Sequence, residues 1–259
     1  AEQSLDKVGA RLSAAIAGFV DRRIHKAYPK AKKAVKTPES VGQASQVRFA
    51  AGCGFYKVVS LFMIGAFLGD ITETIFCRVR AGVWMSRSSV VWGPFSIVWG
   101  LAIALVSWML YQYRNRSDRF LFLVGTFLGG AYEYLCSVFT ELVFGKVFWD
   151  YSRIPFNLGG RINLLYCFFW GIAAVVWFKA LLPKVEKGIE MIPVLAGKLL
   201  VWLMVVFMSC NIAVSCMALI RYDERSRGIK AEASWQQWSD THYDDAKLMK
   251  IYPNAVEPK

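Results

Sequence analysis

Long hydrophobic segments alternate with short polar ones along most of this chain. A transmembrane helix needs about 20 predominantly apolar residues to cross roughly 30 Å of hydrocarbon. Five segments approach or exceed that length, and they run over residues 55–76, 89–111, 120–144, 162–182 and 192–220. Because backbone groups in lipid must be hydrogen-bonded within their own segment, the pattern predicts five transmembrane helices and an all-α membrane protein.

The two ends of the chain have different patterns. In residues 1–54, apolar positions recur at helical spacing as far as Ile24 while arginines occupy other positions, and a basic stretch follows Pro29. We expect a basic amphipathic helix on the membrane surface, ended by the proline and followed by a linker. The polar residues 221–259 are expected to form a small ordered cap on the membrane domain of residues 55–220.

A repeat at an offset of sixty residues is the strongest internal signal. Residues 61–73 align without gaps on residues 121–133, and seven of the thirteen positions are identical, including two glycines and a glutamate. The alignment predicts two related helix pairs, over residues 55–111 and 120–182, that cross the membrane in the same direction. The fifth segment, residues 192–220, lies outside this repeat.

Composition agrees with a membrane protein and narrows the partners. Only 19% of the residues are charged and 56% are hydrophobic, whereas soluble domains are about one quarter charged. Much of the net charge of +12 lies before the first segment, which favours anionic lipid over nucleic acid and places the N-terminus on the cytoplasmic side of the cell membrane. The six cysteines lack a C-x-x-C spacing, so no metal site is expected.

Ionisable residues within the segments are the candidates for function, since a charge at the bilayer centre costs about 2.5–3.5 kcal/mol. Glu133 lies in the middle of the third segment, and Glu73 is its counterpart in the first. Each continues a stripe of glycines spaced by four, so each should face other helices. We predict a substrate- or ion-binding site made by Asp70, Glu73, Arg87, Glu133, Glu141, Asp150, Asn157 and Arg161.

Two interpretations of these charges remain open. In the first, Glu73 and Glu133 line a path or bind a cation, and Arg87 and Arg161 balance them. In the second, the same ion pairs only lock the two helix pairs together. Residues 148–161 are too polar to span a membrane, and Pro155 prevents one continuous helix. We expect them to form an interfacial or re-entrant element lining a polar cavity, or otherwise an aromatic belt with anchoring arginines.

Several motifs within residues 55–190 resemble those of a known family. They are Gly69 with Glu73, Arg87 with Gly93-Pro94 and Trp99-Gly100, Glu133, Glu141, Trp149-Asp150-Tyr151-Ser152, Phe156-Asn157 and Gly160-Arg161. With them the chain is similar to the Putative ABC-transporter type IV proteins, a family of small bacterial membrane proteins of the permease type. The resemblance implies transport and supplies no substrate.

Three classes of function are compatible with these observations. A transport or permease subunit is favoured, because polar residues from two related helix pairs meet within the membrane. The sequence contains no G-x-x-x-x-G-K-[ST] motif, so coupling to ATP would need a separate ATPase or other membrane subunit. A scaffold subunit, also through self-association, and an intramembrane enzyme are the alternatives. An enzyme is less favoured, because no nucleophile elbow or His-x-x-x-His motif is present. Whether the protein uses a cofactor is unknown from the sequence.

Overall fold

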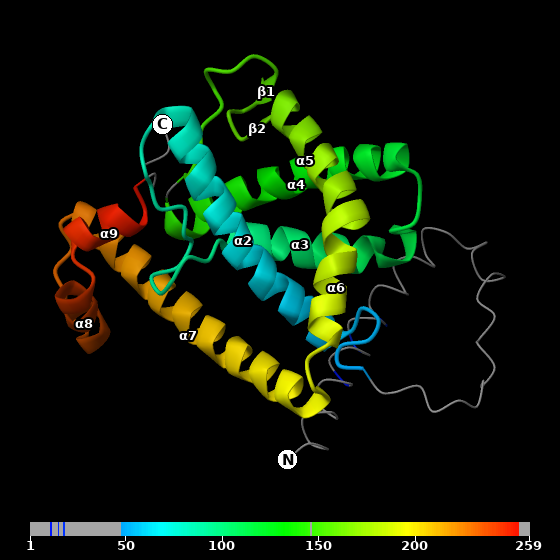
Figure 1. Cartoon of the computed structure of the whole chain (residues 1–259). Coiled ribbons are helices and arrows are strands. Elements are labelled where there is room, and N and C mark those ends of the chain that lie inside the picture. Colours follow the sequence, from blue (N-terminus) through cyan, green and yellow to red (C-terminus); the bar gives the residue numbers. More distant parts are fainter. Residues whose placement is uncertain (1–10, 12–14, 16–17, 19–47, 146, 254–259) are drawn as a thin grey trace.

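The computed structural model describes residues 48–145 and 147–253, together with the single positions 11, 15 and 18. Apart from those three positions, the amphipathic helix expected before Pro29 lies outside the described residues. The elements in chain order are α2 (Phe55–Ala81), α3 (Ile97–Leu110), η2 (Tyr111–Tyr113), α4 (Asp118–Phe144), β1 (Asn157–Leu158), β2 (Ile162–Asn163), α5 (Leu164–Val176), η3 (Trp177–Leu181), α6 (Leu182–Glu190), α7 (Val194–Ser226), α8 (Ser234–His242) and α9 (Asp245–Ile251) (Figure 1).

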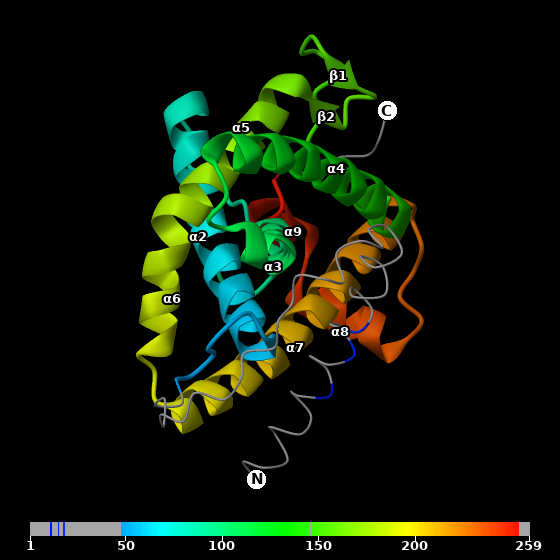
Figure 2. The ribbon, with the colours of Figure 1, turned by 90° about the vertical axis from the view of Figure 1, so that its right-hand side faces the viewer.

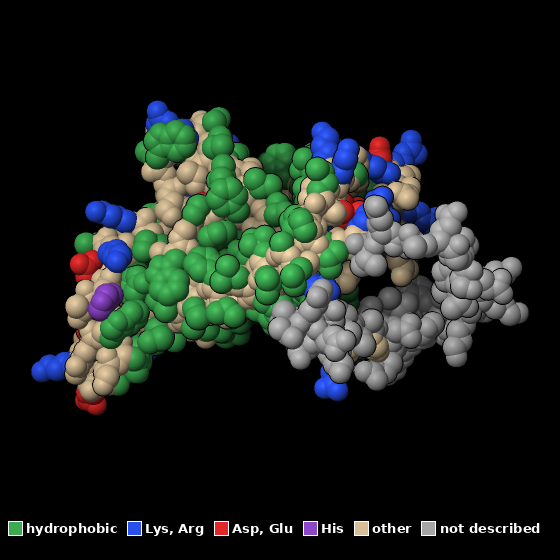
Figure 3. Space-filling model, turned by 60° about the horizontal axis from the view of Figure 1, so that its bottom comes forward, with side chains coloured by type: hydrophobic (Ala, Val, Ile, Leu, Met, Phe, Trp, Pro, Cys, Tyr) green, Lys and Arg blue, Asp and Glu red, His purple; other side chains and the backbone are tan. Residues whose placement is uncertain are grey.

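The described chain is an all-α membrane protein, as the hydrophobic pattern predicted. Four helical stretches are long and apolar enough to cross a bilayer, and the apolar helix at Ile97–Tyr113 is shorter. In the face shown in Figure 3, hydrophobic side chains cover the middle of the molecule and most charged side chains lie towards its two ends. This distribution is typical of a membrane protein whose middle contacts lipid chains and whose two ends contact water and lipid headgroups.

Successive membrane helices run in opposite directions when the short α3 is counted and α5 with α6 is taken as one helix, which gives the molecule two distinct ends (Figure 1). We call one the arm end, where α2 and α7 begin and α6 ends. It is held by Lys57 at the start of α2, whose ammonium group is 3.0 Å from the carboxylate of Glu190 at the end of α6. We call the other the tail end, where α2 and α4 end and where α8 and α9 lie. Figure 2 shows the short helix α3 nearly end-on in the middle of the longer helices.

Glycines allow close contact within each helix pair. A Cβ atom on Gly69 of α2 would lie 2.2 Å from the Cβ of Trp99 in α3. A Cβ atom on Gly129 of α4 would lie 2.3 Å from the Cβ of Trp170 in α5. No side chain fits in either space, so each tryptophan packs directly against the backbone of the preceding helix.

The second helix begins later than the sequence pattern predicted. Residues 89–96 form an irregular loop, and α3 starts only at Ile97. Gly93 has φ +81°, a left-handed conformation that favours glycine, and Pro94 follows it. The prediction that residues 89–96 are helical is therefore wrong, although the segment remains associated with the membrane helices.

Side chains of α7 supply the hydrogen bonds that this loop lacks. Asn211 accepts from the Trp92 backbone N–H at 3.0 Å and donates to the Trp92 carbonyl at 2.8 Å. Ser215, one turn further along α7, accepts from the Val91 backbone N–H at 2.9 Å. Non-helical backbone is tolerated at membrane depth only where protein or water supplies its hydrogen bonds. The helix α7 is therefore required for the structure of the first helix pair.

The fourth segment extends beyond its expected end at residue 182. The helix starts at Leu164, widens to a π-helical turn over residues 177–181 and continues as α6 to Glu190. Pro183 has no backbone N–H to continue the α-helical hydrogen-bond ladder, which fits the change of helix type just before it. The helices α2 and α7 also run further than the sequence pattern predicted, to Ala81 and Ser226.

The described part of the tail, α8 and α9, packs against the tail end of the membrane helices. Arg221 of α7 is 3% exposed and donates to both carboxylate oxygens of Asp240 in α8, at 2.9 and 3.0 Å. These hydrogen bonds hold the pKa of Asp240 below its ordinary value. Tyr243 accepts a hydrogen bond from the indole of Trp92 at 2.9 Å, so the tail also contacts the loop before α3.

Candidate functional site

Glu73 lies near the tail end of α2 and has two hydrogen-bond donors. Arg87, in the loop before α3, donates through Nε to one carboxylate oxygen at 3.0 Å. The indole of Trp99 in α3 donates to the other oxygen at 2.8 Å. The side chain of Glu73 remains 31% exposed. The expected balance of Glu73 by Arg87 is thus present as a direct ion pair.

Glu133 of α4 is more deeply buried, at 8% exposure, and its donors are neutral. The hydroxyl of Tyr151 donates to one carboxylate oxygen at 2.7 Å. The indole of Trp170 in α5 donates to the other at 2.9 Å. Among the described residues no lysine or arginine forms an ion pair with Glu133. Its carboxyl group is therefore hydrogen-bonded but has no cation beside it among the described residues.

The two carboxylates are joined through their tryptophans. The rings of Trp99 and Trp170 are 5.0 Å apart between centroids and inclined by 38°. The neighbouring Tyr132 of α4 donates to the carbonyl of Val98 in α3 at 2.7 Å, which fastens the two helix pairs together at the same place. The structure therefore brings the glutamates of both pairs to one shared aromatic contact.

Asp70 extends this polar group along α2. It lies one turn before Glu73, and the residue is 4% exposed. Its Oδ1 atom has no hydrogen-bond partner in the described part of the chain. It interacts electrostatically with Glu73 and Arg87. A buried carboxylate oxygen without a donor is costly, so Asp70 marks a place where a further positive group could bind.

Arg161 does not balance Glu133, and that expectation is wrong. Its guanidinium donates to Glu141, two turns closer to the tail end of α4, and to the hydroxyl of Ser137 at 3.1 Å. Tyr151 occupies the position beside Glu133 that the arginine was expected to fill. Arg161 and Glu141 thus form a separate ion pair near the tail end of α4.

The predicted site residues Asp150 and Asn157 shape the loop between α4 and α5. Asp150 accepts from the backbone N–H of Ser152 at 2.8 Å, and Asn157 accepts from that of Gly160 at 2.9 Å. Gly160 has φ +69° in the turn of the short β1–β2 hairpin. These contacts do not bring the two side chains to Glu133. They fix the loop that carries Tyr151.

The loop delivers Tyr151 as a hydrogen-bond donor. Burial raises the pKa of its hydroxyl, and the nearby charges of Glu133 and Glu73 raise it further. The hydroxyl therefore stays protonated at neutral pH and can donate to Glu133. The ring of Tyr151 also stacks on that of Tyr166 in α5, with centroids 4.8 Å apart.

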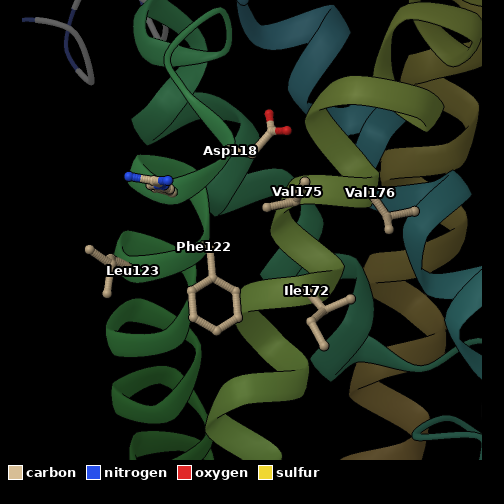
Figure 4. A pocket seen from close by; sticks show the side chains of 7 residues that line it. Asp118, Phe122, Leu123, Ile172, Val175 and Val176 are labelled. Carbon is tan, nitrogen blue, oxygen red and sulfur yellow. The ribbon is translucent and has the colours of Figure 1, made fainter.

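A groove on the outer surface is separate from these polar residues. It has a volume of about 540 Å³, lies between α4 and α5 and is lined by Asp118, Arg119, Phe122, Leu123, Ile172, Val175 and Val176. In Figure 4, Phe122 and Leu123 come from α4, while Ile172, Val175 and Val176 come from α5. Glu133 lies eleven residues further along α4 than Phe122, roughly 16 Å at the helical rise. The groove is lined mostly by apolar side chains and lies near the arm end.

Comparison with known proteins places the chain in a family. A family model described as Putative ABC-transporter type IV matches residues 60–216, which is more than half of the chain and covers most of the first helix pair and all of the second. The chain belongs to this family. No curated protein and no solved structure matches it. Among the described residues of this family member, no group of three or more His, Cys, Asp or Glu side chains could hold a metal ion.

Sequence reasoning missed the donors that hold the two glutamates. Trp99 and Trp170 recur as a Trp-Gly pair in the two predicted repeats, and that recurrence was a usable signal for the site. A different signal was available for the loop before α3. Its partner Asn211 is a polar residue within a long apolar helix, which is unusual in a membrane. The role of Tyr151 depends on the loop conformation, which the sequence pattern does not specify.

Proposed function

We propose that this protein is the membrane-embedded subunit of a transport system, and that Glu73 and Glu133 line the path of the transported species. The observation that carries the proposal is the joined pair of carboxylates. Each is presented by its own helix pair, and the two are connected through the Trp99–Trp170 contact. Polar groups between related helix pairs are a common plan for transporter sites.

Energy for transport would come from another chain. The family name refers to ABC transporters, whereas this sequence contains no phosphate-binding loop. We propose that the arm end faces the cytoplasm, because the basic N-terminal residues precede α2 there. A partner ATPase would then bind at the arm end, and the tail end would face outward.

The proposal is tested by measuring flux into proteoliposomes that contain the purified protein with any chain that co-purifies with it. A panel of labelled ions and small solutes is offered first to the unaltered protein. For each solute that is transported, Glu73→Gln and Glu133→Gln are expected to abolish flux, because the amide removes the charge while keeping the size. Asp118→Asn is the matched control on α4, since its exposed ion pair with Lys179 contributes little.

Two outcomes would contradict the proposal. One is full flux in a Glu133→Gln protein that has a normal circular dichroism spectrum and elutes normally in size-exclusion chromatography. The other is turnover of a substrate by the purified protein in detergent, without a gradient or partner, which would indicate an enzyme.

A further inference from the structure

The charges near the two glutamates do not balance. Asp70, Glu73 and Glu133 contribute three carboxylates, whereas Arg87 is the only cation with which the described residues of this group interact. Glu141 does not change the balance, because it is neutralised by Arg161. Two of the three carboxylates in the membrane domain thus have no cation, and an ionised carboxylate there is costly unless it is paired.

The hydrogen bonds of Asp70 show the same lack of a positive partner. The residue is 96% buried, from its 4% exposure, and Oδ1 receives no hydrogen bond from the described residues. By contrast, both oxygens of Glu73 and both oxygens of Glu133 have donors. A monovalent cation bound beside these residues would offset the charge of one of the two carboxylates that lack a cation.

The surroundings favour an organic cation over a metal ion. Calcium and magnesium take six or more oxygen ligands, while no metal-binding cluster of acids, His or Cys occurs in the described residues. The groups around Glu133 are instead aromatic: Trp99 and Trp170 lie against each other, Tyr132 meets Trp170 edge-on at 6.5 Å, and Tyr151 stacks on Tyr166. Aromatic faces attract organic ammonium groups, with tryptophan the strongest.

We infer that the transported species is an organic ammonium cation, held between the carboxylates of Glu73 and Glu133 and against the rings of Trp99 and Trp170. This inference rests on the proposed function, whose path it fills with a class of substrate. Asp70 lies beside the site and increases its negative charge. The rings of Trp99 and Trp170 are in contact in the present conformation, so binding requires the two rings to separate.

Equilibrium binding of radiolabelled tetramethylammonium to the purified full-length protein in detergent tests the inference. Saturable binding is expected, with competition by unlabelled tetramethylammonium. Potassium ions at equal ionic strength keep the charge without the methyl groups, and tert-butanol keeps a similar shape without the charge. Neither is expected to compete at the same concentration.

Variants locate the bound cation. Glu73→Gln and Glu133→Gln should each weaken binding by about tenfold or more, because each removes one charge from a poorly solvated site. Asp70→Asn should also weaken binding, and it should fold well because it removes a buried carboxylate whose Oδ1 atom has no hydrogen-bond donor among the described residues. Asp118→Asn should bind like the unaltered protein. Circular dichroism and size-exclusion chromatography check that each variant is folded.

Three results would overturn the inference: the folded protein shows no saturable binding, potassium competes as well as tetramethylammonium, or folded Glu133→Gln binds unchanged. The binding assay needs neither a partner nor a gradient, so it separates this inference from the proposed function. Flux of another solute without ammonium binding would remove only the inference. Ammonium binding without flux of any solute would remove the proposed function, and only the ammonium-binding site of the inference would remain.

Discussion

The indole rings of Trp99 and Trp170 lie 5.0 Å apart, and each indole N–H donates to a different glutamate. Trp99 is fixed to Glu73 of α2, and Trp170 to Glu133 of α4. A displacement of one helix pair against the other must therefore change the ring contact, the two carboxylates or both. This linkage makes the tryptophans the natural place to perturb the molecule.

The hydroxyl of Tyr151 should stabilise the fold through Glu133. Tyr151→Phe removes a donor to a buried carboxylate and is expected to lower the free energy of unfolding by about 1.5–3 kcal/mol. Tyr166→Phe is the control, because the two rings stack on each other and, of the two hydroxyls, only that of Tyr151 donates to an acceptor among the described residues. Thermal unfolding of the purified proteins checks this, and equal melting temperatures for the two variants would contradict it.

Gly129→Ala should disrupt the second helix pair. The new methyl group would lie 2.3 Å from the Cβ of Trp170, so the helices must separate and the hydrogen bond to Glu133 must lengthen. We expect a loss of several kcal/mol, at or above the roughly 1–3 kcal/mol typical of overpacking. The measurement is the yield and melting temperature of folded protein.

A second glycine gives the matched control for this variant. Gly188 of α6 has nothing within 4 Å of an added Cβ. Gly188→Ala should raise stability by about 0.5–1 kcal/mol, because alanine is the better helix former. If Gly129→Ala is as stable as Gly188→Ala, the direct packing of Trp170 on the α4 backbone is not present.

Asn211→Ala should release the loop before α3. It removes the partner of both the backbone N–H and the carbonyl of Trp92, at a cost of about 1–3 kcal/mol for each group. Hydrogen exchange at the Trp92 amide should become faster, while amides in the middle of α4 keep their protection. Val206→Ala, on an exposed face of α7, is the control and should leave the exchange at Trp92 unchanged.

Acid should loosen the tail at Asp240. Because Arg221 and then Arg225 hold the pKa of this carboxyl below its ordinary value of about 3.9, its contribution is fully present above that value. The contribution is lost as the pH falls through the lower value of the folded state. Fluorescence of Trp235 and Trp238 in α8 should report the change. Asp240→Asn should show a smaller acid-dependent change over this range, and an unchanged titration would contradict the assignment.

The sequence predicted the helices well because long apolar segments have few other stable structures in lipid. It failed at residues 89–96, where the segment is apolar but the backbone bonds to Asn211 and Ser215 of α7. Hydrophobicity records only that a segment is shielded from water. It does not say whether the backbone within the segment is bonded along a helix or across to a distant side chain.

The candidate site was predicted in part for a related reason. The glycine stripes predicted that Glu73 and Glu133 face other helices, and Trp170 of α5 does donate to Glu133. Arg87 was expected beside Glu73 and forms a hydrogen bond to it. The predicted partner of Arg161 was Glu133, and this was wrong. Two carboxylates of α4, Glu133 and Glu141, lie two turns apart on a similar face, and Arg161 donates to Glu141. The loop conformation decides which of them the arginine reaches.

The dependence of the loop on α7 has a consequence for the order of events during synthesis. Trp92 and Asn211 are 119 residues apart, so a ribosome adding about 5–20 residues per second needs roughly 6–24 s to pass from one to the other. During that interval the peptide groups around Trp92 have no native partner. These peptide groups must be hydrogen-bonded by water, by the insertion machinery or by another protein until α7 has been synthesised and inserted.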